Sequence, residues 1–172
     1  MNVFVGLLRA INVGGTGKLP MRELVELCQH AGFKDVQTYI QSGNVLFKTA
    51  LSEARAQAKL ERALTAKLGK AASATLRTAD ELEATLTKNP YKSSPPNYVY
   101  VMFMSEPFPR DALAELNAPD GETAAVHGRE LFVHFPKGMG QSKLKVPFAK
   151  QATGRNLNTV TKLATMARAL GQ

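Results

Sequence analysis

The chain has 172 residues, of which 44% are hydrophobic and 21% charged, as in a globular protein rather than a disordered or fibrous one. Its single cysteine, Cys28, excludes an intramolecular disulfide and argues against an oxidised, secreted fold. The net charge of +8 favours an acidic partner such as a nucleotide, a nucleic acid or a phosphorylated metabolite, although a solvated basic surface also explains it. The first apolar run is too short to span a bilayer and no basic segment precedes it, so we expect a cytoplasmic protein.

The first half of the chain predicts the element order β-α-β-β-α-β. The expected strands cover residues 3–8, 36–41, 45–47 and 74–77, and the expected helices cover about 20–31 and 52–68. The first strand is apolar on both faces, which is typical of a central strand covered on both sides. Pro20 suits the first turn of the helix that follows, and Gly32 suits its end. This order is that of a ferredoxin-like unit.

The second half repeats the order, beginning β-α-β-β. Its expected elements are a strand at 98–104, a helix from Pro109, a hairpin of 123–126 and 131–135, a short helix from Pro147 and a last helix after Asn156 or Asn158. A further helix is expected to open at the capping box formed by Thr78 and Glu81. The Pro- and Ser-rich residues 89–97 predict a linker. We therefore expect an α+β fold of two ferredoxin-like (βαββαβ-type) subdomains with duplicated topology, at 1–88 and 98–172, the second including a C-terminal helix.

The residues that most often carry chemistry form no recognisable catalytic or metal motif. The three histidines lack ligand spacing, and Cys28 falls on the apolar face of the first helix, so we predict no metal site. Ser42 and Ser142 have no nucleophile elbow around them. A turn role for Ser42, and a cap role for Ser142 on a helix near Lys143, are the simpler interpretations.

Four polar segments instead predict an anion site. Each contains glycines, amides or hydroxyls, and all but the second include a basic residue; they are residues 9–18, 41–44, 138–143 and 155–159. The glycine-rich part of the first, VGGTGK, matches neither the P-loop nor the dinucleotide fingerprint. If the segments converge, Arg9, Lys18, Lys143 and Arg155 could surround a phosphate. The alternative is that Arg9 and Arg155 make structural links between the two halves.

The same regions resemble a known bacterial family, the domain-of-unknown-function family 1697. The resemblance rests on four motifs, RAINVGG at 9–15, TYIQSGNV at 38–45, GQSKL at 140–144 and TGRNLNTVTKL at 153–163. Ala10, Gln141 and Leu157 depart from the family pattern, and the loss of a common arginine at Gln141 removes one cation. The resemblance implies two ferredoxin-like subdomains and supplies no activity.

Motif residues carried over from this resemblance, together with Lys18, make up the candidate ligand-binding set. These are Arg9, Asn12, Gly14, Gly15, Lys18, Gln41, Ser42, Asn44, Ser142, Lys143, Arg155, Asn156, Thr159 and Lys162. The leading hypothesis is a protein that binds a phosphate-bearing small molecule or nucleotide. Single-stranded nucleic-acid binding and a non-catalytic protein-interaction role are the alternatives. We predict no cofactor, and the sequence assigns neither a reaction nor an oligomeric state.

Overall fold

The computed structural model describes residues 1–9, 19–40, 43–114, 116–145, 148 and 150–172. They form two compact units, one of Met1–Glu81 with Leu163–Gln172 and one of Leu82–Lys162. The predicted domain limits, with a linker at 89–97, remain a prediction.

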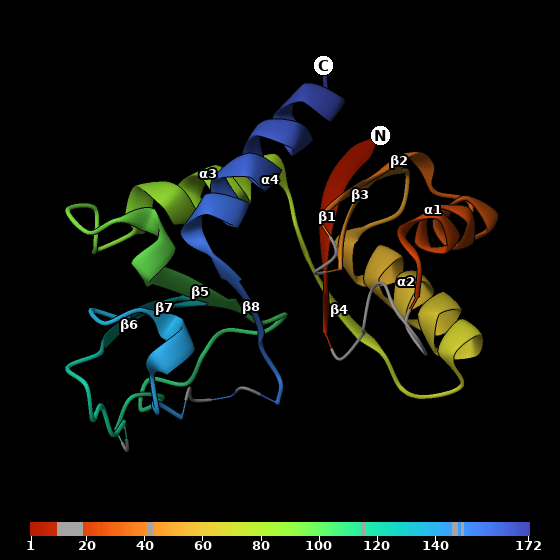
Figure 1. Ribbon diagram of the computed structural model, residues 1–172. Helices are drawn as coiled ribbons and strands as arrows, with labels where there is room; N and C mark the ends of the chain where they lie inside the picture. Colours follow the sequence, from red (N-terminus) through yellow and green to blue (C-terminus); the bar gives the residue numbers. More distant parts are fainter. Residues whose placement is uncertain (10–18, 41–42, 115, 146–147, 149) are drawn as a thin grey trace. The chain divides into compact units, whose positions relative to one another are not determined.

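The first unit is built on a four-stranded antiparallel sheet with the strand order β2-β3-β1-β4 (Figure 1). Its elements are β1 (Asn2–Arg9), α1 (Met21–His30), β2 (Lys34–Tyr39), β3 (Asn44–Thr49), α2 (Glu53–Leu68) and β4 (Ser73–Arg77). The order and the antiparallel pairing are those of a ferredoxin-like unit, which confirms the prediction.

Helices α1 and α2 cover one face of this sheet, where they share a single core with alternate residues of β1. Phe4 and Leu8 point into this core, whereas Val5 and Leu7 lie on the opposite face and are also buried. Both faces of β1 are therefore covered, as its sequence predicted. Gly32 ends α1 with a left-handed φ of +92°, which a residue with a side chain rarely adopts.

The second unit contains a sheet of the same topology, with the order β6-β7-β5-β8. Its strands are β5 (Val99–Phe103), β6 (Thr123–His127), β7 (Glu130–His134) and β8 (Thr153–Asn156), and all neighbours are antiparallel. The predicted duplication of the sheet is therefore confirmed. Two short 3₁₀ turns are present: η1 (Pro96–Tyr98) directly precedes β5, and η2 (Met139–Gln141) follows β7.

The helix predicted from Pro109 is wrong, because this segment forms successive turns. The amide of Ala112 bonds to the carbonyl of Pro109 and that of Leu116 to the carbonyl of Leu113, each three residues back. Ala112 and Leu113, adjacent in sequence, both pack on the core around Phe108. A helix would place neighbouring side chains about 100° apart, and a segment this short is a marginal helix in any case.

The helix predicted near Ser142 and Lys143 is also wrong for the described residues. Ser142 follows η2 in extended conformation, and residues 143–145 have no regular structure. The predicted start at Pro147 lies outside the described residues. Gly138, directly before η2, has a left-handed φ of +82°, so a continuous helix through this glycine-rich stretch is disfavoured.

Two further helices follow the fourth strand of each sheet and are capped as predicted. In front of α3 (Ala79–Lys88), the Thr78 hydroxyl accepts the amide of Glu81, and the Glu81 carboxylate accepts the amide of Thr78. In front of α4 (Leu157–Leu170), the Asn156 side chain accepts the amide of Thr159 at 2.9 Å. Both caps act within four residues, which is why the sequence alone could predict them.

The segment between α3 and β5 is attached to the second unit. Asn89 is buried, and its side-chain oxygen accepts the amide of Tyr91. The ring of Tyr91 stacks on His134 with centroids 5.3 Å apart.

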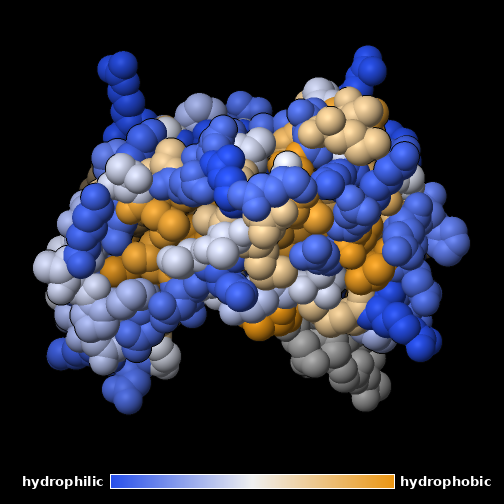
Figure 2. Space-filling view, turned by 90° about the horizontal axis from the view of Figure 1, so that it is seen from above, coloured by the Kyte–Doolittle hydropathy of each residue, from blue (hydrophilic) through white to orange (hydrophobic). Residues whose placement is uncertain are grey.

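Hydrophilic residues cover most of the face shown in Figure 2, with smaller hydrophobic patches between them. Among the described residues, none of the helices is both long and apolar enough to cross a membrane.

Gly154 offers a direct test of packing in the second sheet. A Cβ at this position would lie 2.3 Å from Cε1 of Tyr100 and 2.7 Å from Sδ of Met102. We expect Gly154→Ala to lower the free energy of unfolding by about 1–3 kcal/mol, because the Tyr100 ring must move. Urea denaturation measures this, with Gly140→Ala as control, since a Cβ there meets nothing within 4 Å. Equal stability of the two variants would contradict the packing argument.

Candidate functional site

One end of the first sheet brings two of the predicted motif segments together. Asn44 pairs with Tyr39 of β2 and Leu7 of β1, and Arg9 pairs with Ser73 of β4. The end of β1, the starts of β3 and β4 and the end of β2 therefore form one row across the sheet. We call this row the β1 end; it comprises Arg9, Ile40, Gly43, Asn44 and Ser73.

Arg9 is the charged residue of the β1 end. Its side chain is half-buried, and Nε donates to the Ser73 hydroxyl oxygen at 3.2 Å. Within the described part of the chain, Arg9 makes no ion pair, and this hydrogen bond is its only side-chain contact of that kind. One edge of the guanidinium is therefore held in place, while no described carboxylate neutralises the charge.

Asn44 has a structural role that the sequence could not show. It is fully buried, and its Nδ2 donates to the carbonyl of Tyr39 at 3.0 Å, which ties β3 to the end of β2. Next to it, the carbonyl of Gly43 accepts the amide of Leu8 at 2.9 Å. Gly43 has a φ of +78°, and a Cβ there would lie 3.1 Å from that of Leu8. These two residues shape the β1 end.

Helix α1 starts at the same end of the sheet. β1 and β2 both run antiparallel to β3, so the helix that connects them runs back from the β1 end. Pro20 occupies the N-cap position and has no side-chain acceptor for the first amides of the helix. The positive end of the helix dipole thus lies at the same end of the sheet as Arg9, although Arg9 follows Val5 and Leu7 on the face opposite to α1.

In the second unit, Arg155 is buried and bonded to its own backbone. It is 8% exposed, and its Nη1 donates to the carbonyl of Gly154 at 2.7 Å. The same carbonyl accepts the Tyr100 hydroxyl at 3.3 Å. Burial lowers the pKa of Arg155 to about 10, and Tyr100 partly offsets this. Burial raises the pKa of Tyr100, while the guanidinium lowers it, so Tyr100 stays neutral and Arg155 charged at pH 7.

Arg77 is the counterpart of Arg155 in the first unit, and the sequence reasoning missed it. Arg77 pairs with Val5 of β1 as Arg155 pairs with Val101 of β5. Arg77 is fully buried, and its Nη1 donates to the carbonyl of the preceding residue, Leu76, at 2.9 Å. The sequence does contain a pattern that could have identified Arg77: in both halves an arginine stands directly before the residue that caps a helix. Because the arrangement occurs twice, it favours a structural role for Arg155.

Ser142 is bonded to a buried carboxylate. Its hydroxyl donates to Oε1 of Glu122 at 2.5 Å and accepts the amide of Leu144 at 3.1 Å. Glu122 is 4% exposed, and the bond from Ser142 is the main reason that its pKa lies below the ordinary value, assisted by the amide of Asp120 and by Lys137. The hydroxyl proton is already used, and the carboxylate repels anions. This geometry does not favour phosphate binding at Ser142.

The remaining predicted residues of the second unit are dispersed. Lys143 and Lys162 are exposed, Thr159 is buried in α4, and Asn156 serves as the α4 cap. These residues, with Ser142 and Arg155, lie in a different unit from Arg9 and Asn44. The convergence of all four segments remains a prediction. Six predicted residues lie outside the described residues: Asn12, Gly14, Gly15, Lys18, Gln41 and Ser42.

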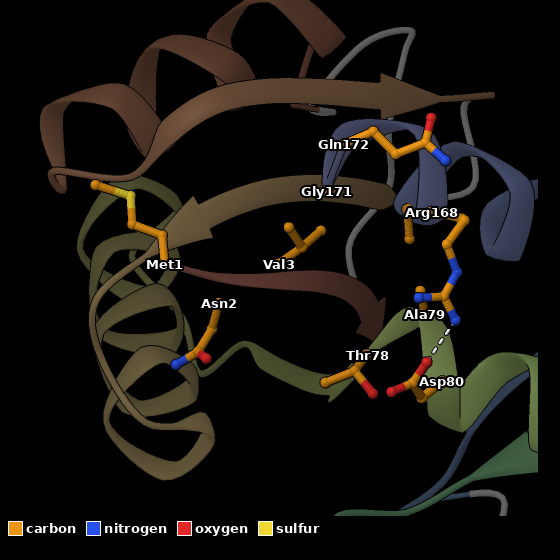
Figure 3. Close-up of a pocket in the computed structure, with 10 residues that line it drawn as sticks. Met1, Asn2, Val3, Thr78, Ala79, Asp80, Arg168, Gly171 and Gln172 are labelled. Carbon is orange, nitrogen blue, oxygen red and sulfur yellow. Dashed lines mark hydrogen bonds and ion pairs between the residues drawn. The ribbon is translucent and has the colours of Figure 1, made fainter.

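Neither of two further surface pockets contains a predicted site residue. The first, of about 320 Å³, is shown in Figure 3 and lined by Met1, Asn2, Val3, Thr78, Ala79, Asp80, Ala167, Arg168, Gly171 and Gln172. Its cation, Arg168, is ion-paired with Asp80. The second, between α1 and α2, is lined by Glu23 and Glu26 as well as by His30 and Lys67, so it has no excess of positive charge to attract an anion.

Metal and thiol chemistry find no support in the described residues. Among them, no group of three or more histidine, cysteine or acidic side chains could hold a metal ion. Cys28 is fully buried, as predicted, and burial raises the pKa of its thiol to about 12. A thiol that stays protonated at pH 7 is a poor nucleophile.

The fold and the β1 end define a duplicated ferredoxin-like α+β protein with an arginine at the end of a central strand. The family model described as "Protein of unknown function (DUF1697)" matches residues 1–132. The chain therefore belongs to this family, as its motifs predicted. The match includes the motifs at 9–15 and 38–45 but ends before those at 140–144 and 153–163.

A solved structure has the same fold along nearly the whole chain. It is described as conserved bacterial protein SP0830 from Streptococcus pneumoniae, and it is 28% identical in sequence with a TM-score of 0.77. The alignment covers 96% of this chain and 98% of that chain. No curated protein matches the chain.

The bond between Ser142 and Glu122 predicts a pH-dependent effect on stability. We expect Ser142→Ala to lower the Tm by about 2–6 °C at pH 7, because a buried carboxylate loses its donor. The bond lowers the folded-state pKa of Glu122 below its ordinary 4.5, so its contribution is present above that pH and is lost as the pH falls through the lowered pKa. The difference from wild type should therefore shrink as the pH falls below 4.5.

Thermal unfolding between pH 3 and pH 7 measures this difference. Ser93→Ala, at an exposed position of the same unit, is the control and should match wild type throughout. If Ser142→Ala lowers the Tm by the same amount at every pH, loss of the hydrogen bond to Glu122 is not the cause of the destabilisation.

Proposed function

We propose that the protein binds a phosphate-bearing small molecule or nucleotide at the β1 end. The observation that carries the proposal is Arg9, a half-buried arginine with one edge held by Ser73 and no carboxylate partner among the described residues. Arginine can present two parallel N–H groups to a phosphate, which makes it well suited to this role. The start of α1 lies at the same end of the sheet, on its other face, and adds positive potential there.

Comparison of the two repeats supports Arg9 over Arg155. Because Val5 corresponds to Val101, the same offset along the chain makes Ser105 the counterpart of Arg9. Arg9 is therefore particular to the first repeat, whereas Arg77 and Arg155 recur. The second sheet does have an arginine near this position, Arg129, but it comes from the hairpin turn and donates to the carbonyl of Ser105. A residue that differs from its counterpart in the other repeat is not required by the fold that the two repeats share.

The strength of such a site follows from its charge-assisted hydrogen bonds. Each contributes about 1.5–3 kcal/mol, so two or three of them support micromolar binding after ordering costs. The net charge of +8 adds a long-range attraction for anions. We assign no reaction, since no described residue near Arg9 has the pairing of a general acid or base.

Stacking of single-stranded nucleic acid on the sheet, as in RRM domains, has less support. That mode needs exposed aromatic residues on the two central strands. In β1 and β3 the aromatic residues are Phe4 and Phe47, and both are buried in the core beneath α1 and α2. No particular observation favours the protein-interaction role.

We expect Arg9→Ala to weaken binding of AMP and of ribose 5-phosphate by about 10- to 100-fold, because a charge-assisted bond to the phosphate is lost. Isothermal titration calorimetry measures both affinities. Arg62→Ala is the matched control: it removes the same charge from an exposed position in the middle of α2.

Equal affinities for wild type and Arg9→Ala would refute the site. A 10-fold loss in both arginine variants would instead indicate a general charge effect. If the phosphates bind only at low salt and equally to every variant, the basic surface alone accounts for the interaction.

A further inference from the structure

Ile40, at the β1 end, has a backbone conformation that its side chain disfavours. Its φ is +46°, in the left-handed region, where a β-branched residue is a genuine outlier. The residue is also 47% exposed, so burial of its side chain does not explain why an isoleucine occupies this position. A glycine or asparagine here would avoid the unfavourable conformation, and a polar side chain would avoid the exposed apolar surface.

The other two non-glycine residues with left-handed φ among the described ones have local explanations. Asp35, at φ +50°, belongs to a residue type that tolerates this region, and its carboxylate pairs with Lys48 at 3.1 Å. Phe148, at φ +61°, packs on the core of the second unit and contacts Phe108 edge to face. Ile40 has neither a suitable side chain nor a core to enter.

The second repeat supplies an internal comparison for this position. Asn44 pairs with Tyr39 on one side and Leu7 on the other, and in the second sheet Glu130 pairs with His127 and Phe103 at the corresponding register. The residue after Tyr39 is Ile40, and the residue after His127 is Gly128, whose φ is +60°. The first residue after the paired strand end is thus left-handed in both repeats, although the connection has four residues in the first repeat (40–43) and two in the second (128–129). The second repeat has the residue that this conformation favours, whereas the first has isoleucine.

The neighbours of Ile40 hold it in this conformation. The preceding carbonyl, of Tyr39, accepts the buried amide of Asn44 at 3.0 Å. Unfavourable backbone conformations persist where the surroundings determine them in this way, and they concentrate at binding sites. A single exposed apolar residue is ordinary, but one held in a disfavoured conformation at the rim of a candidate site is not.

Ile40 lies at the distance from Arg9 that a small organic phosphate can bridge. β1 and β2 run in the same direction with β3 between them, so their ends are two strand spacings, or about 10 Å, apart. The row therefore offers a cation at one position and an apolar side chain at another.

We infer that Ile40 is a specificity-determining residue, and that the ligand is a phosphate ester carrying a flat apolar group such as a nucleobase rather than a sugar phosphate alone. This inference rests on the proposed phosphate site at Arg9. Arg9 holds the phosphate, and Ile40 packs against the apolar group. The unfavourable φ is retained because it presents the side chain to the ligand.

The test compares AMP with ribose 5-phosphate, which differ by the base. We expect Ile40→Asn to raise the Tm by a few degrees, because asparagine tolerates the left-handed conformation. The same variant should weaken AMP binding about five-fold or more through the loss of apolar contact, and leave ribose 5-phosphate binding unchanged. Ile40→Leu keeps an apolar side chain and should retain AMP affinity within about two-fold. Met139→Asn, at another exposed apolar residue that is 43% accessible, should change neither affinity.

The outcomes separate this inference from the proposed function. If Ile40→Asn weakens both ligands equally or neither, Ile40 does not determine specificity, whereas a loss of both ligands in Arg9→Ala still supports the phosphate site. If Arg9→Ala has no effect on ribose 5-phosphate, or if neither probe binds wild type, the phosphate site and the inference are both overturned. A lower Tm for Ile40→Asn would show that the left-handed conformation of Ile40 does not destabilise the wild-type protein, which would contradict the inference.

Discussion

The pairing of β1 with β3 on one side and β4 on the other is the constraint on which the first unit depends. It places a strand that is apolar on both faces at the centre of the sheet, where both faces can be buried. The same pairing decides what lies beside the end of that strand. Register places Ser73 opposite Arg9 and Asn44 opposite Leu7, so a hydrophobic requirement along β1 positions the polar groups at its end.

The duplicated sheet separates structural features from functional candidates. Arg77 and Arg155 occupy equivalent places, bond to the carbonyl of the preceding residue and stand directly before a helix cap. Their recurrence indicates that the repeat itself needs them. Arg9 and Ile40 have no such counterpart, since Ser105 and Gly128 stand at the corresponding positions. Departures from an internal repeat are therefore the more informative guide to binding in this protein.

Several motif residues turn out to shape the fold. Asn44 ties β3 to the end of β2, Asn156 caps α4, and Ser142 donates to the buried carboxylate of Glu122. Each side chain uses its polar groups within the chain, and a group already bonded has less to offer a ligand. A family motif thus combines residues of both kinds, and only the hydrogen-bond partners distinguish them. Arg9 stands out because one edge of its guanidinium is positioned by Ser73 and no described carboxylate neutralises it.

The sequence by itself determined the elements whose causes are local, together with the family. A short run that is apolar on both faces identified β1, and the capping box at Thr78 and Glu81 marked the start of α3, because these patterns span a few residues. Tertiary structure alone decided that residues 109–114 form turns rather than a helix, that Ser142 finds a partner 20 residues away in Glu122, and that Ile40 adopts a left-handed φ. These outcomes depend on register and core packing between segments distant in the chain, which no local pattern encodes.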